Sequence, residues 1–580
     1  MNWSPVPDLI SPGRPARVAL AATLLVATIQ AMRGWSRLPD SLGDTDDALR
    51  LSMVRDLLSG RAWFDTHIDR LQPPEGLDMH WSRLLDGAMA LLDGILGLFL
   101  SPETAELVFR FVWPLLWVFP LVLGAALVAR RLGGSAAVLA AAIFIASVPV
   151  QMQFGPGRID HHNAQIALSM LVLAGAVNLE TRWGPWLAGI ATGLLLAIGL
   201  EAIIFAALCG VKIALRFADG AHYAKAARRY ALALGATALI AFAAQTPPRL
   251  WTATACDMLS VNLLAGLAAA SLGLLLASFV KGGRLLRLFA VLAAGGVSLA
   301  FYLGLDPACA SGPFAHMAPR LKTDWFDHVV EVMSWPDFYK IRPPLAATLM
   351  APPVLALIAF AIAVVRERKL LRDPAFILVV AVFIAALLSG FFVVRSLSYA
   401  GAFAAVLLAG VFPLLLPKRI GGNFVATGIA ALLISPTPIA FAAAAIAGSQ
   451  RAETSADRKL CTASASFAEF AAVTPGLVLA DIDTGPHLLA HTPHSALAAP
   501  YHRMGEGIST AHDLWAAPAG FAVSLLKTRG VVYVMLCPAR GTSPVAFPKD
   551  SLRTALEKGD VPSGLDPVPA GDVFKVWRVK

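Results

Sequence analysis

Charged residues and cysteines are scarce in this sequence, and internal repeats are missing from it. Only 15% of the 580 residues are charged, and the formal net charge of +9 comes mainly from short basic clusters between apolar runs. Clusters of this kind are typical of topology signals in membrane proteins, so the positive charge does not indicate a nucleic-acid partner. Without repeats, the chain also lacks the internal symmetry that is typical of many transporters.

Five cysteines are too few for a disulfide scaffold. Cys209 lies in an apolar run, where packing is its expected role, and Cys256 and Cys309 fall on loops or helix ends. Cys461 and Cys537 flank the core of a C-terminal soluble region. A bridge between these two would suit an oxidising compartment, but the sequence leaves their redox state open.

Long apolar runs dominate what the sequence does contain, since hydrophobic residues make up 57% of the chain and the mean hydropathy is +0.67. Runs long enough to cross a bilayer predict an all-α polytopic membrane protein with about thirteen transmembrane helices. The apolar run at 84–100 is instead placed along the membrane surface, because counting it as a span would put the basic pair at 130–131 on the outer side. The predicted spans are 16–32, 107–128, 135–151, 163–179, 185–200, 202–217, 230–245, 259–280, 288–304, 345–365, 375–394, 397–416 and 423–447.

The basic loops between these spans fall on the same side of the membrane as the N-terminus, which the positive-inside rule makes the cytoplasmic side. The outer side then collects the first outer loop 34–103, the turn FGPGRIDHH, the outer loop 305–344 and a tail. Runs such as LVLADI and GVVYVML, mixed with helical stretches, predict that the tail 448–580 is a small α/β domain that follows a transmembrane domain, 1–447.

Three of these outer segments carry side chains suited to a divalent cation. The segment DTDD at 44–47 is open to two compatible interpretations, a helix N-cap and a cation site. The turn at 158–162 offers Asp160 and His162, whose alternative roles are capping and packing, and the loop 305–344 offers Glu331, whose alternative is plain solvation. Because topology places all three at the ends of different helices on one side, we expect a Mg²⁺ or Mn²⁺ site there.

These motifs and their order resemble those of the GT-C superfamily of membrane glycosyltransferases, especially the catalytic subunit of bacterial and archaeal oligosaccharyltransferase. DTD at 44–46 is similar to the first acidic motif of that family, and WFDTHIDRLQPPEGLDMHWSRLLD is similar to the stretch that follows it in archaeal members. RIDHHNAQ resembles the second motif, and HVVE, ending at Glu331, resembles the SVSE element. VVRSLSYA places Arg395 where the family has an arginine that holds the phosphate of a lipid carrier. The acceptor-recognition motif WWDYG is missing, and the nearest text, ADIDTG at 480–485, lacks both tryptophans.

The resemblance implies a GT-C fold and transfer of a sugar or oligosaccharide from a polyprenyl phosphate or diphosphate carrier. It implies a bacterial inner-membrane protein whose active site and tail face the periplasm. Arg395 would bind the donor phosphate, with snorkelling toward the lipid headgroups as the alternative. The implied metal ligands are Asp44, Asp46, Asp160, His162 and Glu331, and the implied catalytic acids are Asp44, Asp46, Asp160 and Glu331. Further residues with possible donor or acceptor contacts are Asp47, His80, Arg83, His161, Glu201, Asp483, His502 and Arg503.

The acceptor stays open between a protein, a glycan and a lipid. The runner-up within the same enzyme class adds a single sugar to a lipid or cell-envelope glycan. A transporter or flippase would place ionisable residues deep inside its spans, whereas those of this chain gather at the outer ends. A scaffold protein accounts for the tail but gives no reason for acids and an imidazole to converge from three loops.

Overall fold

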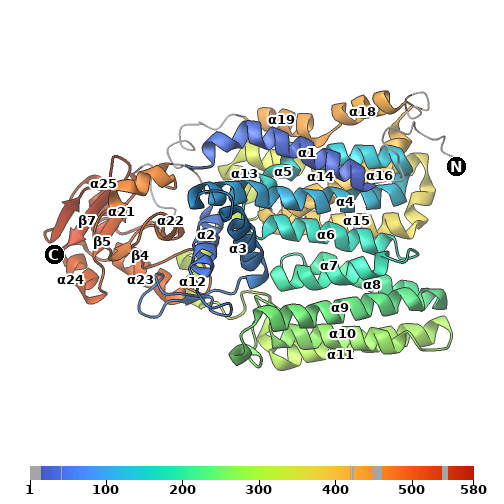
Figure 1. The fold of residues 1–580 in the computed structure, drawn as a ribbon, viewed down its shortest axis with the longest axis horizontal. Coiled ribbons are helices and arrows are strands. Elements are labelled where there is room, and N and C mark those ends of the chain that lie inside the picture. The colour runs from blue at the N-terminus through green and yellow to red at the C-terminus, as the bar shows by residue number, and fades with distance from the viewer. Residues whose placement is uncertain (1–14, 41, 418–419, 421–422, 449–459, 539–545) are drawn as a thin grey trace.

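The computed structural model describes residues 15–40, 42–417, 420, 423–448, 460–538 and 546–580. Long helices lie side by side in one body, and a mixed α/β domain lies beyond one end of them (Figure 1). Eight helical segments of the described chain are long and apolar enough to cross a membrane, which confirms the predicted multi-pass helical architecture. They are formed by α1 (Pro15–Gly34), α4 (Pro102–Ile145), α9 (Ala224–Gln245), α11 (Arg284–Leu305), α14 (Pro343–Arg366), α15 (Pro374–Phe392), α16 (Leu397–Leu415) and the pair α18 (Phe424–Leu433) and α19 (Pro436–Ile446).

The other predicted spans are arms of α4 or shorter helices. The backbone of α4 leaves helical geometry at Gly133 and Gly134, and its two arms correspond to the predicted spans 107–128 and 135–151. Gly134 has a φ of 69°, which favours glycine at this bend. Four apolar helices of 15 to 17 residues lie near the lower length limit of a membrane span: α6 (His162–Val177), α7 (Gly184–Ile198), α8 (Ile203–Asp219) and α10 (Val261–Ala277).

Burial differs sharply between these helices. α16 is apolar on all sides and buried along nearly its whole length, which is typical of a helix at the centre of a bundle. By contrast, Arg287 is the one buried residue of α11, which packs one face against α10 and leaves most of its other residues exposed. An apolar helix left exposed in this way is suited to contact with lipid tails.

Two helices of the first outer loop, α2 (Thr45–Leu58) and α3 (Arg83–Gly97), run across the ends of the long helices (Figure 1). α3 buries Leu85 and Met89 against the protein and leaves Leu91 and Ile95 exposed. This direction and this exposed apolar edge agree with a helix that lies along the membrane surface, as the basic pair at 130–131 led us to expect.

The C-terminal domain is built on a five-stranded mixed sheet with the strand order β4-β3-β5-β7-β6. β3 (Leu477–Leu479) pairs in parallel with both β4 (Ser495–Ala496) and β5 (Tyr533–Leu536), and β7 (Lys575–Val579) is antiparallel to β5 and to β6 (Leu565–Val568). The helices of this domain are α21 (Ala468–Ala471), α22 (Thr484–His491), α23 (Gly505–Ala516), α24 (Ala519–Thr528) and α25 (Leu552–Lys558). The predicted α/β character of the tail is therefore confirmed.

The hydrophobic core of this domain extends into the outer loops. Its buried cluster includes Leu71 and Trp81 from the first outer loop and Leu321 from the loop 305–344. The strand β2 (Leu77–Asp78), which pairs with β1 (His67–Ile68), adds Leu77 to the same cluster. Segments that are hundreds of residues apart in the chain thus form one body, the outer body, at one end of the long helices.

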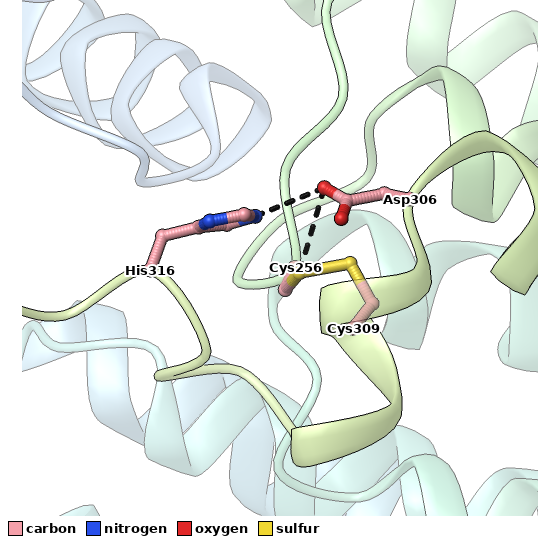
Figure 2. A group of neighbouring side chains, drawn as sticks. All are labelled: Cys256, Asp306, Cys309 and His316. Carbon is pink, nitrogen blue, oxygen red and sulfur yellow. Dashed lines mark hydrogen bonds and ion pairs between the residues drawn. A yellow bond between two sulfur atoms is a disulfide. The ribbon is translucent and has the colours of Figure 1, made fainter.

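Two disulfides stabilise this outer body. Cys461 and Cys537 are bridged, which settles the state that the sequence left open, and the bridge joins the start of the tail to the residue that follows β5. A second bridge, Cys256–Cys309, was not predicted, because the sequence placed these residues only on loops or helix ends (Figure 2). It ties the α9–α10 connection to the start of the loop that carries Glu331, beside an ion pair between His316 and Asp306 (2.9 Å).

Thiol labelling tests both bridges. In denaturing detergent without a reductant, a maleimide reagent should modify one cysteine, Cys209, and after reduction it should modify all five. The number of labels is read from a gel shift or an intact mass. Cys209→Ala is the matched control, since it should remove the only label of the unreduced protein. Three labels before reduction would mean that one of the two bridges does not form.

Candidate active site

The first acidic motif forms the N-terminus of α2. The side chain of Asp44 accepts hydrogen bonds from the backbone N–H groups of Asp46 (3.1 Å) and Asp47 (3.2 Å). The side chain of Asp47 in turn accepts one from the backbone N–H of Asp44 (2.9 Å). This reciprocal pair is a capping box, so the helix-capping interpretation is correct for Asp44 and Asp47. Asp46 is the acid of this motif that stands outside the cap.

The fully buried carboxylate of Asp47 joins the first motif to the second. Asp47 Oδ1 accepts hydrogen bonds from the backbone N–H groups of Ile159 (2.7 Å) and Asp160 (2.8 Å). Asp47 Oδ2 pairs with Arg158 Nη1 (2.9 Å), and the same guanidinium pairs with Asp44. The two motifs, more than 100 residues apart in the chain, are thereby held against each other.

The second motif surrounds Asp160 with cationic and imidazole groups. Asp160 is buried, its Oδ1 lies 2.6 Å from His161 Nδ1, and its Oδ2 lies 3.2 Å from His162 Nε2. Arg50 of α2 approaches Oδ1 to 3.6 Å. On the far side of the two rings, Glu201 places Oε1 3.7 Å from His161 Nε2 and Oε2 3.2 Å from His162 Nδ1. Both histidines therefore lie between two carboxylates.

The acids of three outer segments act on one another. Burial raises the pKa of Asp46 well above its ordinary value, and nearby carboxylates raise it further, those of Asp160, Asp44 and Glu331. Partial desolvation and the charge of Asp44 also raise the pKa of Glu331, although its side chain is exposed. Burial on its own lowers the pKa of His161, but Asp160 and Glu201 raise it to about 10. The acids of the three segments therefore repel one another, and a cation would relieve that repulsion.

Arg395 lies on the short 3₁₀ turn η10 (Val394–Ser396) that precedes α16. Its Nη2 is 2.9 Å from Glu201 Oε1, so the arginine has an acidic partner that the sequence did not reveal. The backbone N–H of Val394 donates to the carbonyl of Met333 (2.9 Å), which holds this turn beside the segment of Glu331. Glu201 itself sits at the break between α7 and α8, between the predicted spans 185–200 and 202–217.

The remaining candidate residues separate into those near the site and those that support the fold. His502 Nε2 (2.7 Å) and Arg503 Nη2 (2.7 Å) both contact Asp257, and the ring of His80 lies 4.8 Å from that of His502. Burial lowers the pKa of His80 well below its usual value.

Two further candidates lie elsewhere. Arg83 is buried and supports the outer loop, since it donates to the carbonyl oxygen of Trp63 (3.0 Å) and pairs with Asp86 (3.2 Å). Asp483 is exposed at the start of α22. Neither Asp257 nor Arg158 was assigned a role from the sequence, and only the crowding of charged residues at 158–162 pointed to Arg158.

Comparison with known proteins adds information on the fold. No protein-family model matches the chain, and no curated protein matches it. The archaeal oligosaccharyltransferase AglB from Archaeoglobus fulgidus, in complex with an inhibitory peptide and a dolichol-phosphate, is 14% identical with a TM-score of 0.62, over 90% of this chain and 69% of that one. The chain has the GT-C fold.

Two further structures of the A. fulgidus oligosaccharyltransferase match this GT-C chain. The enzyme tethered to an acceptor peptide containing the NVT sequon is 15% identical with a TM-score of 0.61, over 97% of this chain and 74% of that one. Its complex with Zn and sulfate is 15% identical with a TM-score of 0.58, over 90% of this chain and 68% of that one. The fold implied by the motifs is therefore confirmed.

One group at this site has ligand atoms close enough together to hold a metal ion: Asp160, His161 and His162, whose candidate ligand atoms lie within 4.8 Å of one another. Asp160 Oδ2 is buried and accepts no hydrogen bond among the described residues, although His162 Nε2 lies 3.2 Å away. Two ligand atoms that face each other without a hydrogen bond are suited to sharing an ion, and a carboxylate with an imidazole is a donor pair that Mg²⁺, Mn²⁺ or Zn²⁺ accepts.

Asp46→Asn and Asp47→Asn should change stability in opposite directions. With a chelator present, Asp46→Asn should raise the melting temperature, because it removes one of several repelling carboxylates. Asp47→Asn should lower the unfolding free energy by about 3 kcal/mol, because it leaves the buried guanidinium of Arg158 with one carboxylate fewer. Thermal unfolding of the purified variants in detergent with EDTA measures both, and equal melting temperatures would contradict the two roles.

Proposed function

We propose that this chain is a metal-dependent glycosyltransferase. It moves a sugar or oligosaccharide from a polyprenyl phosphate or diphosphate carrier to an acceptor at the outer face of the membrane. The observation that carries the proposal is the convergence of Asp46, Asp160 and Glu331 from three outer segments, beside the guanidinium of Arg395. Acids of this kind, at the mouths of membrane helices and next to a cationic phosphate ligand, suit a lipid-borne phosphorylated donor.

The ligands of the structurally similar proteins support the same proposed function. The A. fulgidus oligosaccharyltransferase was solved with dolichol-phosphate, with an acceptor peptide, and with Zn and sulfate. A polyprenyl phosphate donor, a divalent ion and an acceptor are the three components that our proposal requires. We place the protein in the bacterial inner membrane, with 1–447 as the catalytic transmembrane domain and 448–580 as a periplasmic domain.

Each site residue then has a chemical role. When bound, a divalent cation supplies a Lewis acid for the charge that develops on the leaving phosphate. The residues that would hold it are Asp44, Asp46, Asp160, His162 and Glu331. The guanidinium of Arg395 would bind the carrier phosphate, because five N–H donors leave several for phosphate oxygens beyond its pair with Glu201. Glu331 would also orient the nucleophile of the acceptor.

The stretch 480–485 of the tail favours a second class of acceptor, a lipid or cell-envelope glycan. Asp481, in the stretch nearest to the WWDYG motif, is paired with Arg553 inside the C-terminal domain. The stretch 480–485 also has no tryptophan. An acidic residue already paired within its own domain is a poor ligand for a peptide sequon. Transfer of a sugar to a lipid or cell-envelope glycan is therefore the alternative to protein glycosylation.

The decisive measurement is the release of polyprenyl phosphate or diphosphate from a pool of lipid-linked sugars. The purified protein should release it with Mn²⁺ or Mg²⁺ and stop when EDTA is added. Asp160→Asn and Glu331→Gln should each lower kcat about 100-fold or more, because each removes a charged group from the reacting centre.

Asp327→Asn is the matched control for this experiment. Asp327 lies four residues before Glu331 on the same outer loop, is exposed, and pairs with Lys322 (2.7 Å). It should keep the activity of the parent protein. A glycosyltransferase role is excluded if Asp160→Asn and Glu331→Gln release the carrier as fast as Asp327→Asn.

A further inference from the structure

Glu201 contacts both halves of the site: the set of candidate metal ligands and the candidate phosphate ligand. Its Oε2 lies 3.2 Å from Nδ1 of His162, the histidine of the metal set. Its Oε1 lies 2.9 Å from Nη2 of Arg395, the candidate phosphate ligand. One carboxylate therefore touches a residue from each half, one through each oxygen.

The local structure fixes this carboxylate in place. Glu201 lies two residues after Gly199, the C-cap of α7, and the side-chain amide of Gln165 from α6 packs directly against Gly199, where an added Cβ would lie 2.2 Å from Gln165 Nε2. The hydroxyl of Tyr399, from buried α16, lies within hydrogen-bond distance of both Gln165 Oε1 (2.9 Å) and Glu201 Oε2 (3.3 Å), and its single hydrogen is available to either. Three helices thus determine where Glu201 lies.

We infer that Glu201 is a positioning residue that sets the tautomer of His162 and the orientation of Arg395 together. The inference rests on the proposed function, because it takes His162 as a metal ligand and Arg395 as the phosphate ligand. Glu201 touches neither the donor nor the ion, and it acts through these two side chains.

The histidine half of the inference follows from imidazole chemistry. A neutral imidazole carries its proton on one nitrogen and a lone pair on the other. When Nδ1–H donates to Glu201, the lone pair lies on Nε2, which faces the unsatisfied Asp160 Oδ2 at 3.2 Å. Carboxylates that accept from a ligating histidine typically change metal affinity 10- to 100-fold when they are removed.

The arginine half follows from charge and from the flexibility of the side chain. Arg395 has several rotatable bonds, and an ion pair with a buried, fixed carboxylate holds its guanidinium in one orientation. Loss of the negative charge would free the guanidinium to turn away or to pair with Glu331. The affinities for the cation and for the carrier phosphate are therefore both set by Glu201.

The test measures binding without turnover. The affinity of the purified protein for Mn²⁺ and for polyprenyl phosphate is determined by calorimetry for the parent protein, Glu201→Gln and Glu201→Asp. Glu201→Gln should weaken Mn²⁺ about 10- to 100-fold and should also weaken polyprenyl phosphate. Arg395→Lys should weaken polyprenyl phosphate and leave Mn²⁺ unchanged. Glu201→Asp keeps the negative charge on a shorter side chain, so its affinities for both ligands should lie between those of the parent protein and Glu201→Gln.

Glu180→Gln is the matched control, because Glu180 accepts a hydrogen bond from Tyr223 (3.0 Å) beside Arg216, outside the site. It should change neither affinity. If Glu201→Gln melts lower but binds both ligands like the parent, Glu201 is merely structural and the inference is overturned. A parent protein that binds Mn²⁺ and releases no carrier overturns the proposed function instead, while the comparison of affinities still decides the role of Glu201.

Discussion

The carboxylate of Asp47 holds the site together, because it accepts hydrogen bonds from the backbone of a segment more than 100 residues away in the chain. It accepts hydrogen bonds from the backbone N–H groups of Asp44, Ile159 and Asp160, and it forms an ion pair with Arg158. Burial raises the pKa of Asp47 well above its ordinary value, and the charges of Asp44 and Asp160 raise it further, while Arg158 and the backbone N–H donors oppose that shift. The position of Asp160, and of the two histidines that follow it, depends on this single side chain. The other carboxylates can then converge without pushing the two motifs apart.

Bringing these carboxylates together costs free energy because they repel one another, and nearby cationic side chains offset that repulsion only in part. Arg158 neutralises the cap residues, and Arg50 and His161 stand beside Asp160. Asp46 has no such cationic neighbour of its own at hydrogen-bond distance among the described residues, and its pKa is raised accordingly. Under the proposed function, a divalent cation would relieve this residual repulsion. Stability and function therefore make opposite demands on neighbouring acids of one motif.

The sequence was most informative where local patterns decide the structure. The lengths of the apolar runs predicted the helices, and the basic clusters predicted the direction in which they run. The DTDD motif at 44–47 predicted both a helix N-terminus and an acidic site. The missed features all depend on partners far away in the chain. Cys256 meets Cys309, Glu201 meets Arg395, and Asp257 meets His502, at separations of 53 to 245 residues. A residue type shows what such a side chain can do, but only the packed helices show which partner it has.

The outer body attaches the C-terminal tail to the ends of the long helices, which limits how the tail can vary. Tyr501 donates to the backbone carbonyl of Thr45 (3.3 Å), and the next two residues of the tail clamp Asp257, whose neighbour Cys256 is bonded to Cys309. The tail is thus attached to the helix ends through one short segment. The acids, His162, Glu201 and Arg395 come instead from the helix ends and their loops. The two sets are carried by different elements, so substitutions in the tail can alter its own surface without moving Asp160, Glu201 or Arg395.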